Sequence, residues 1–219
     1  MKKVLSLLLV LVLLFTLMGC DLFSQRELTR GTIEENTYTN TFLGFSFTKP
    51  QMWKYSSDEE IAAMVNLGAE AVCGENFKET LEKSDSLCDM MAVDPMTSSS
   101  ISVGYDNLKR NFTASMTVEE YVETVKKQYE NVEDVEATFS EVLTEVKLGE
   151  ITFTRVFCTL AMYGVEMEQA YYLYKTDGYM VFIVVTLTGG YTALQIEAMF
   201  HSKQKREIPY GQREIYVPL

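Results

Sequence analysis

The chain has 219 residues, a hydrophobic fraction of 47% and a formal net charge of −12 at pH 7. This length suits one domain with a sizeable apolar core. The excess of acidic residues argues against nucleic acid as a partner, because the phosphate backbone would be repelled. The single histidine and the lack of a Cys-x-x-Cys pair argue against a histidine-based zinc site and against a redox motif.

The N-terminus has the layout of a secretory signal. Lys2 and Lys3 precede an apolar run over residues 4–18, which only Ser6 and Thr16 interrupt. The run is short for a helix that spans a bilayer, and it is typical of a signal peptide that is removed from the mature chain. Removal of residues 1–19 would leave 200 residues with a net charge of −14, because the removed part holds two lysines and no acid.

The end of this signal, Leu17-Met18-Gly19-Cys20, resembles the lipobox of bacterial lipoproteins. In that family the cysteine thiol is joined to a diacylglycerol and becomes the new N-terminus. Two acyl chains give lasting attachment, since each buried CH₂ contributes about 0.8 kcal/mol. We therefore expect lipidation at Cys20 and a protein anchored on the extracytoplasmic face of the cell membrane. An ordinary signal peptide that ends in a cysteine by chance is the alternative.

Four parts are predicted along the chain. They are a lipoprotein signal peptide over 1–19, a lipidated tether over 20–35, a folded domain over 36–201 and a basic C-terminal tail over 202–219. The tether is polar and of mixed charge. A flexible linker of its length reaches about 20 Å, which is enough to lift a domain off the lipid headgroups.

The first half of the domain mixes strands with a short helix. Strict alternation over residues 43–48 predicts a strand whose apolar face contains Leu43, Phe45 and Phe47. The capping-box spacing of Ser57 and Glu60 predicts a helix start, and the helix should bury Ile61, Met64 and Val65 before it ends near Gly68. Residues 74–87 are expected to form a loop or a short surface helix. Strands should follow over 88–93 and 101–105.

The second half begins with the clearest helix. A capping box at Thr117 and Glu120 precedes an apolar stripe formed by Val118, Tyr121, Val122, Val125 and Tyr129. Turn signals at Leu148-Gly149, Tyr163-Gly164 and Asp177-Gly178 then divide a run of strands, and the Asp-Gly pair favours a type I′ hairpin turn. Residues 180–185 are apolar throughout, so both faces of that strand should be covered. A final helix is expected to carry Leu194, Ile196, Met199 and Phe200, with His201 in its last turn.

This order of elements predicts an α+β fold, with an antiparallel β-sheet against which helices pack. A resemblance to a known family makes this fold prediction more specific. The segment Asn36-x-Tyr38-x-Asn40, Gly44-Phe45-x-Phe47, Pro50-x-x-Trp53, Ser57-Asp58-Glu59-Glu60 resembles the opening of a group of largely uncharacterised surface lipoproteins of Gram-positive anaerobes. Their fold is similar to the PsbP-like α/β sandwich. The resemblance implies that fold and no known catalytic set.

The remaining cysteines suggest structural positions. Cys73 and Cys88 flank a charged segment and could form a disulfide, if their Cα atoms lie within bonding reach. An anaerobic producer would leave them reduced. Cys158 shares a strand face with Val156 and Leu160, so we expect a buried, inert thiol.

The candidate binding residues are Tyr172 and Tyr174, which share one face of a strand. If the other face enters the core, the two rings would form an exposed platform for a sugar or for a protein partner. The alternative is that this face lies under a helix. The acidic clusters are interpreted as solvated surfaces, because no calcium-binding loop motif is present.

We therefore expect a lipid-anchored extracytoplasmic binding or assembly module without catalytic residues, metal ligands or a cofactor. Its partner would be an unknown protein or glycan in addition to the membrane. His201 should be partly exposed and distant from any triad partner. The alternatives are a cell-envelope hydrolase or other enzyme, in which a carboxylate with a raised pKa replaces histidine, and a weak divalent-cation binder.

Overall fold

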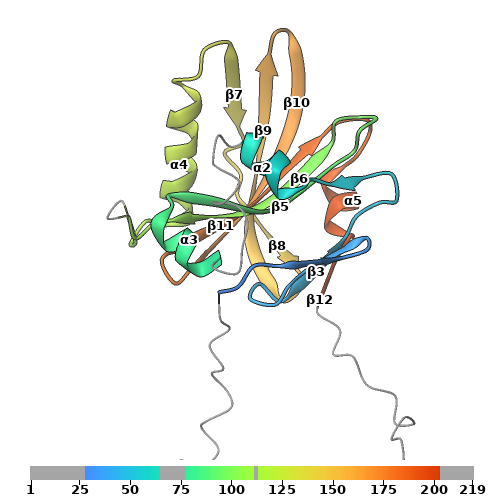
Figure 1. Ribbon diagram of the computed structural model, residues 1–219. Coiled ribbons are helices and arrows are strands. Elements are labelled where there is room, and N and C mark those ends of the chain that lie inside the picture. Colours follow the sequence, from blue (N-terminus) through green and yellow to red (C-terminus); the bar gives the residue numbers. More distant parts are fainter. Residues whose placement is uncertain (1–27, 65–76, 111–112, 203–219) are drawn as a thin grey trace, which may run out of the picture.

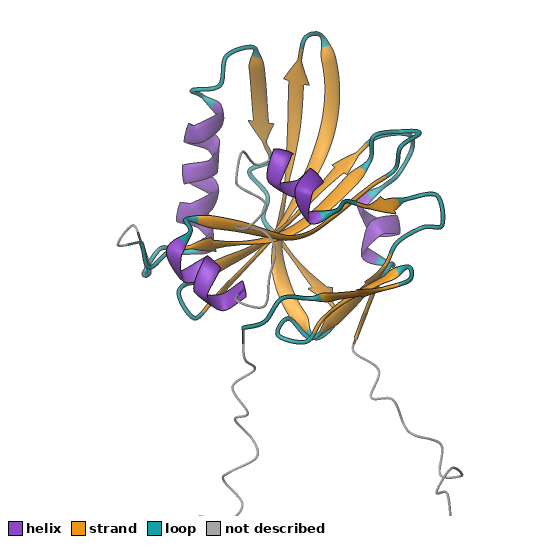
Figure 2. Ribbon diagram, in the orientation of Figure 1, coloured by secondary structure: helices purple, strands orange, loops and turns teal. Residues whose placement is uncertain are grey.

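The computed structural model describes residues 28–64, 77–110 and 113–202. Strands account for 47% of the described residues and helices for 19%, so the protein is richer in strand than the predicted α+β pattern implied (Figure 2). Its helices are α2 (Asp58–Met64), α3 (Phe77–Lys83), α4 (Val118–Tyr129) and α5 (Ala193–Glu197). Its strands are β1 (Thr32–Glu34), β2 (Thr37–Asn40), β3 (Phe45–Thr48), β4 (Lys54–Tyr55), β5 (Ser86–Val93), β6 (Ser100–Asn107), β7 (Val135–Phe139), β8 (Thr144–Leu148), β9 (Ile151–Met162), β10 (Val165–Thr176), β11 (Tyr179–Leu187) and β12 (Phe200–Ser202).

The described strands form two antiparallel sheets. The small sheet has the order β1-β2-β3-β12, and the large sheet has the order β4-β5-β6-β11-β10-β9-β7, with β8 also paired to β9 (Figure 1). The main core lies between them. Buried rings of Tyr38, Phe45 and Phe47 from the small sheet share a cluster with Val103 and Ile183 from the large one. The pattern of the sequence predicted a single antiparallel sheet with packed helices, so the second sheet was not expected.

Helix α4 covers the opposite face of the large sheet. Its N-terminus is held by the predicted capping box, in which the Glu120 N–H donates to Thr117 Oγ1 (3.2 Å) and the Thr117 N–H donates to Glu120 Oε2 (2.8 Å). Val122 is buried against this second core, whereas Tyr121 and Val125 are partly buried. The predicted apolar stripe therefore faces the sheet, although only part of it is fully enclosed.

Strand β11 is central and covered on both faces, as predicted. Val181, Ile183 and Val185 are fully buried in the main core, and Phe182 packs against the cluster under α4. The hairpin turn before it uses left-handed backbone, with φ of +46° at Asp177 and +80° at Gly178. The type I′ interpretation of Asp-Gly is confirmed, since both central residues of such a turn need positive φ.

His201 lies in β12, not in the last turn of the final helix. Helix α5 ends at Glu197, and the chain then pairs with the free edge of β3, where His201 lies opposite Ser46. The Phe200 ring contacts Phe45 and Phe47, each at 5.1 Å between ring centroids. In this strand the Phe200 ring is buried against the small sheet, a tertiary contact that the local spacing of residues 194–200 does not reveal.

The folded domain also begins before the predicted boundary at residue 36. Strand β1 pairs with β2, and Leu28 packs against the main core. At the other end β12 extends the domain to Ser202. The signal peptide, Cys20, Cys73, Val65, Gly68 and the tail after residue 202 lie outside the described residues.

Helix α3 falls inside the segment predicted as a loop or a short surface helix. The prediction of a short surface helix is confirmed, since Lys78, Glu79, Glu82 and Lys83 are exposed, and Phe77 and Leu81 bury the other side of the helix in the main core. In α2 the predicted core residue Ile61 is buried beside Cys88.

Candidate functional site

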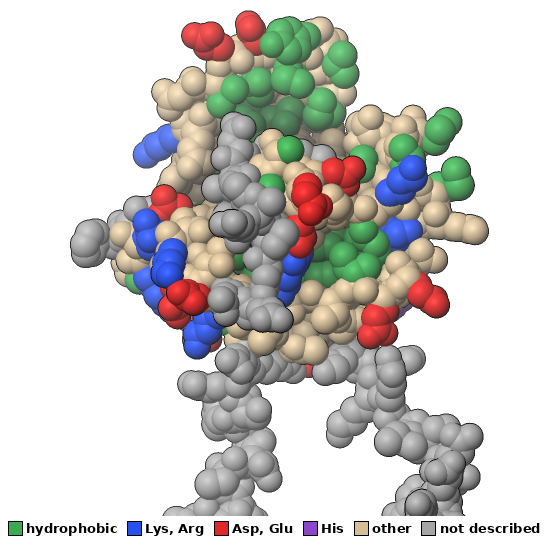
Figure 3. Space-filling view, in the orientation of Figure 1, with side chains coloured by type: hydrophobic (Ala, Val, Ile, Leu, Met, Phe, Trp, Pro, Cys, Tyr) green, Lys and Arg blue, Asp and Glu red, His purple; other side chains and the backbone are tan. Residues whose placement is uncertain are grey.

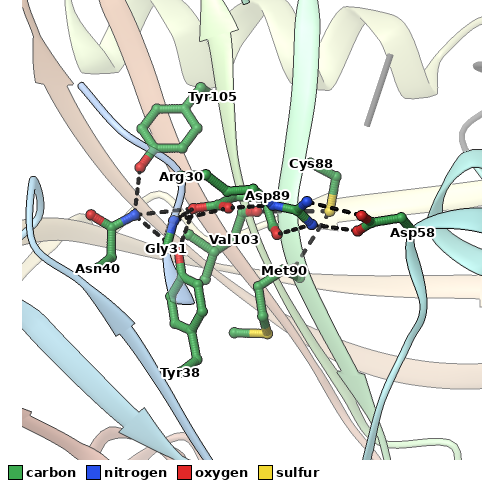
Figure 4. Close-up of polar contacts among 10 residues, drawn as sticks. All are labelled: Arg30, Gly31, Tyr38, Asn40, Asp58, Cys88, Asp89, Met90, Val103 and Tyr105. Atoms are coloured by element: carbon green, nitrogen blue, oxygen red, sulfur yellow. Dashed lines mark hydrogen bonds and ion pairs between the residues drawn. The ribbon is translucent and has the colours of Figure 1, made fainter. Parts of the chain in front are cut away.

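Two polar regions are candidates for function, and the first is a network centred on Asp89 (Figure 4). The pairing of β5 with β6 shifts register between Cys88 and Met90, and Asp89 occupies this irregularity. A bulge re-aims a side chain, which accounts for a carboxylate inside an apolar strand. The buried carboxylate accepts hydrogen bonds from Tyr38 Oη (2.5 Å), Asn40 Nδ2 (3.0 Å) and the Gly31 N–H (3.0 Å).

This network links distant parts of the chain. The Arg30 guanidinium pairs with the Asp58 carboxylate on α2 and lies 3.5 Å from Asp89 Oδ1. The Asn40 amide also donates to Tyr105 Oη at 2.8 Å on the large sheet. The network thereby connects the segment before β1, both sheets and α2.

The polar groups of the network are buried and hydrogen-bonded to one another. Burial raises the pKa of Asp89, although its hydrogen bonds and the Arg30 charge oppose this shift. Burial, together with the Asp89 charge, also raises the pKa values of Tyr38 and Tyr105. In the described part of the chain every buried side-chain nitrogen and oxygen has a hydrogen-bond partner. The Asp89 network is therefore a structural element.

The second region is a groove between α4 and strands β6, β11 and β10. It has a volume of about 470 Å³. Tyr121, Val125 and Tyr129 line it from α4, because their spacing of four residues places them on one helix face. From the sheet it is lined by Asp106, Gln169, Tyr171, Phe182 and Val184. We call this feature the α4 groove.

One end of the α4 groove carries a carboxyl group. The Tyr121 hydroxyl donates to Asp106 Oδ2 at 2.5 Å, and Ser86 also hydrogen-bonds to this carboxyl group. Burial raises the pKa of Asp106, and burial beside Asp106 raises that of Tyr121. A carboxyl group with a raised pKa in a groove is a common feature of functional sites.

The other end carries a chain of hydroxyl and amide groups. The Tyr171 hydroxyl donates to Gln169 Oε1 at 2.7 Å, and the Gln169 amide donates to Thr186 Oγ1 at 3.1 Å. Because the Tyr171 proton is committed to Gln169, the Tyr129 hydroxyl must donate to Tyr171 across 2.8 Å. The Tyr129 oxygen therefore keeps lone pairs that can accept a hydrogen bond from a ligand.

Between these two ends lie the apolar side chains of Phe182 and Val184, both only partly buried. A groove of this kind can place the apolar face of a small ligand against ring and methyl groups. Its ends can meet hydroxyl or amide groups of the ligand.

A second cavity, of about 610 Å³, lies beside α4, and its lining includes Glu119, Glu123, Lys126 and Lys127. Lys126 already pairs with Glu123 at 2.6 Å. Among the described residues no three histidine, cysteine, aspartate or glutamate side chains gather as a metal site would require.

The prediction that Tyr172 and Tyr174 form an exposed platform is wrong. Tyr172 is fully buried in the main core and donates to Glu197 Oε1 at 2.8 Å, and Glu197 also binds Arg155 at 2.6 Å. Tyr174 is partly buried and packs on Phe153. The small sheet and α5 cover this face of β10. The ring that reaches the α4 groove is Tyr171, on the opposite face.

His201 is exposed on β12, as expected. Cys158 is a fully buried thiol, as predicted. Cys88 is a buried free thiol that donates to the Met90 carbonyl, and burial raises its pKa to about 12. Its suggested disulfide partner, Cys73, lies outside the described residues.

No protein-family profile and no curated protein matches the sequence. The solution structure of cyanobacterial PsbP (CyanoP) from Synechocystis sp. PCC 6803 is similar, with a TM-score of 0.44 and 11% identity, over 84% of this chain and 99% of that one. A crystal structure from Bacteroides thetaiotaomicron is similar with a TM-score of 0.38 and 13% identity, over 80% of this chain and 49% of that one. The first neighbour has the PsbP-like fold named above. Both TM-scores are low, so we draw no functional inference from either likeness.

Within residues 28–64, 77–110 and 113–202, no helix combines the length and hydrophobicity needed to cross a bilayer.

Proposed function

We propose that this protein is a lipid-anchored, extracytoplasmic binding module without catalytic activity, and that its ligand binds in the α4 groove. The anchor would be Cys20, on the basis of the Leu17-Met18-Gly19-Cys20 motif. The observation that carries the ligand site is the arrangement of the groove. Apolar Phe182 lies between a carboxyl group at one end and an accepting tyrosine hydroxyl at the other.

The ligand class that suits this groove is a small hydroxylated molecule such as a sugar. A pyranose ring has an apolar face of C–H groups that can pack on Phe182, Val184 and the tyrosine rings. Its hydroxyl groups can donate to Asp106 and Tyr129. The volume of about 470 Å³ is within the range of small-molecule sites.

A second candidate function is hydrolysis, and one observation favours it. Burial raises the pKa of Asp106, so this carboxyl group could act as a general acid with Tyr121 as its hydrogen-bond partner. A hydrolase would add water across the glycosidic bond of a disaccharide and release two monosaccharides, whereas a binding module would release the disaccharide unchanged. Analysis of a disaccharide of the bound sugar after prolonged incubation therefore separates the two functions.

The ligand site can be tested by NMR of the protein in nanodiscs of neutral lipid. Glucose, galactose and N-acetylglucosamine would be titrated separately while backbone amide shifts are recorded. We expect one sugar to shift the amides of Asp106, Gln169 and Phe182, and Tyr129→Phe with Asp106→Asn to abolish the shifts. Shifts confined to other regions, or none for all three sugars, would refute the groove as a sugar site.

The anchor is tested separately. Metabolic labelling with a fatty-acid analogue should label the wild-type protein and leave Cys20→Ala unlabelled. Label on the variant, or none on the wild type, would show that the lipoprotein interpretation is incorrect. This result does not depend on the ligand of the groove.

A further inference from the structure

The ends of three strands of the large sheet project from the body of the molecule. In Figure 1 the β9–β10 hairpin and the start of β7 form the end of the molecule opposite β3 and β12, where the described chain begins and ends. We define the projecting tip as residues 132–136 and 161–166. It lies at the far end of α4 from the capping box.

Strand register gives the projecting tip an apolar face. Val135 pairs with Met162, and Met162 pairs with Val165, so the three side chains form a row across β7, β9 and β10. Met162 is 38% exposed, Val165 is 60% exposed and Tyr163, in the hairpin turn, is 81% exposed. Large apolar side chains this exposed and this close together indicate an interaction surface.

The opposite face of the projecting tip is acidic. Glu136 and Glu166 both pair with Ala161, so the two glutamates form the next row and point to the other side of the sheet. Both are exposed, as are Glu133 and Asp134 in the preceding loop. Residues 132–136 and 161–166 contain no lysine, arginine or histidine. Figure 3 shows hydrophobic side chains gathered at this end of the molecule with acidic side chains at its margin.

We propose that the projecting tip docks a protein partner that presents lysine or arginine side chains next to an apolar patch. Apolar contact with Tyr163 and Val165 would supply the buried centre of the interface. A partner that reaches around the edge of the tip would place its lysine or arginine side chains against the acids on the other face, which would select a basic partner. The same acids would repel a second copy of this chain and an anionic lipid surface. The proposal does not depend on a ligand in the α4 groove, although Val132 borders both surfaces.

The test measures binding of two fluorescein-labelled peptides to the full-length protein in phosphatidylcholine nanodiscs, with empty nanodiscs subtracted. The peptides are Lys-Tyr-Lys-Leu-Lys-Tyr-Lys and the same sequence with glutamate in place of lysine. We expect the lysine peptide to bind at least about tenfold more tightly, and added salt to remove most of this preference.

Two variants locate the binding. Glu136→Gln with Glu166→Gln should weaken binding of the lysine peptide about tenfold, and Val165→Ser should weaken both peptides severalfold. The matched control, Glu141→Gln with Glu145→Gln, removes two exposed acids elsewhere and should leave binding unchanged.

Three results would overturn the proposal. The first is equal binding of the lysine and glutamate peptides. The second is an equal loss of binding in the control variant and in the tip variant. The third is a dimer in sedimentation analysis that becomes a monomer in Val165→Ser. The last result would assign the tip to contact between copies of this chain.

Discussion

The Asp89 network and the α4 groove both contain a carboxyl group and tyrosine hydroxyls, but Asp89 is buried and Asp106 is only partly buried, and the two carboxyl groups differ in their hydrogen-bond partners. Asp89 accepts from a tyrosine, an amide and a backbone N–H, with Arg30 close by. Asp106 accepts from Tyr121 and Ser86 and borders an open groove. A saturated network stabilises the fold, whereas a partly open one keeps hydrogen-bonding capacity for a ligand.

The two regions also differ in what they connect. The Asp89 network joins the segment before β1 to both sheets and α2, so its loss would affect the whole domain. The polar groups of the α4 groove join one helix to one face of the large sheet. We therefore expect changes at Asp89 to lower stability, and changes at Asp106 to alter ligand binding.

The largest effect is expected for Asp89→Ala. The change leaves Tyr38, Asn40 and the Gly31 N–H without their acceptor inside the core, and the free energy of unfolding should fall by about 3–5 kcal/mol. Urea denaturation measures it. Asp85→Ala removes an acid paired with Arg110 at the surface and should cost less than about 1 kcal/mol. Equal costs for the two variants would show that the network does not stabilise the fold.

Removal of a tyrosine hydroxyl is expected to lower stability by different amounts in the two regions. Tyr38→Phe removes a hydroxyl donor from fully buried Asp89 and should cost about 1–3 kcal/mol. Tyr121→Phe removes the donor from Asp106, where water in the groove can replace it, and should cost less than about 1 kcal/mol. A larger loss for Tyr121→Phe than for Tyr38→Phe would reverse the assignment of the two regions.

Periodicity in the sequence predicted the elements that carry both regions. The capping box at Thr117 and the stripe on α4 were confirmed, as was the covered strand over residues 180–185. These features depend on local spacing, which a sequence displays directly. The register that places Tyr171 beside α4 follows from pairing across three strands, so local spacing did not reveal it.

The two carboxyl groups were missed for a related reason. Asp89 receives its backbone hydrogen bond from Gly31, 58 positions away, in a segment predicted to be a tether. Asp106 lies just beyond the strand predicted over residues 101–105, and its partner Tyr121 was expected only as part of the apolar stripe of its helix. An aspartate or glutamate within a predicted strand is the only sign of such a group in the sequence. It does not show which distant donors will form hydrogen bonds with the carboxyl group.

The smallest expected effect is a pH dependence at Asp106. Burial raises its pKa above the unfolded value of about 4. Between the two pKa values the folded state keeps a proton that the unfolded state has released, so stability falls as pH rises through this window. Asp106→Asn removes this titration. Asp89 is present in both the variant and the wild type, so its own contribution to the pH dependence of stability cancels in the comparison. The stability of the variant relative to wild type should therefore increase as pH rises above about 4. A constant difference would contradict the raised pKa.

The division between a structural network and a ligand site is tested most directly by measuring affinity and stability on the same two variants. The ligand would be the sugar that shifts the groove amides, with affinity from calorimetric titration and stability from urea denaturation. Asp106→Asn should weaken the affinity at least about tenfold with little loss of stability. Asp89→Asn should lower the stability by about 2 kcal/mol or more and leave the affinity of the folded protein unchanged. Loss of affinity in Asp89→Asn with normal binding in Asp106→Asn would contradict the assignment.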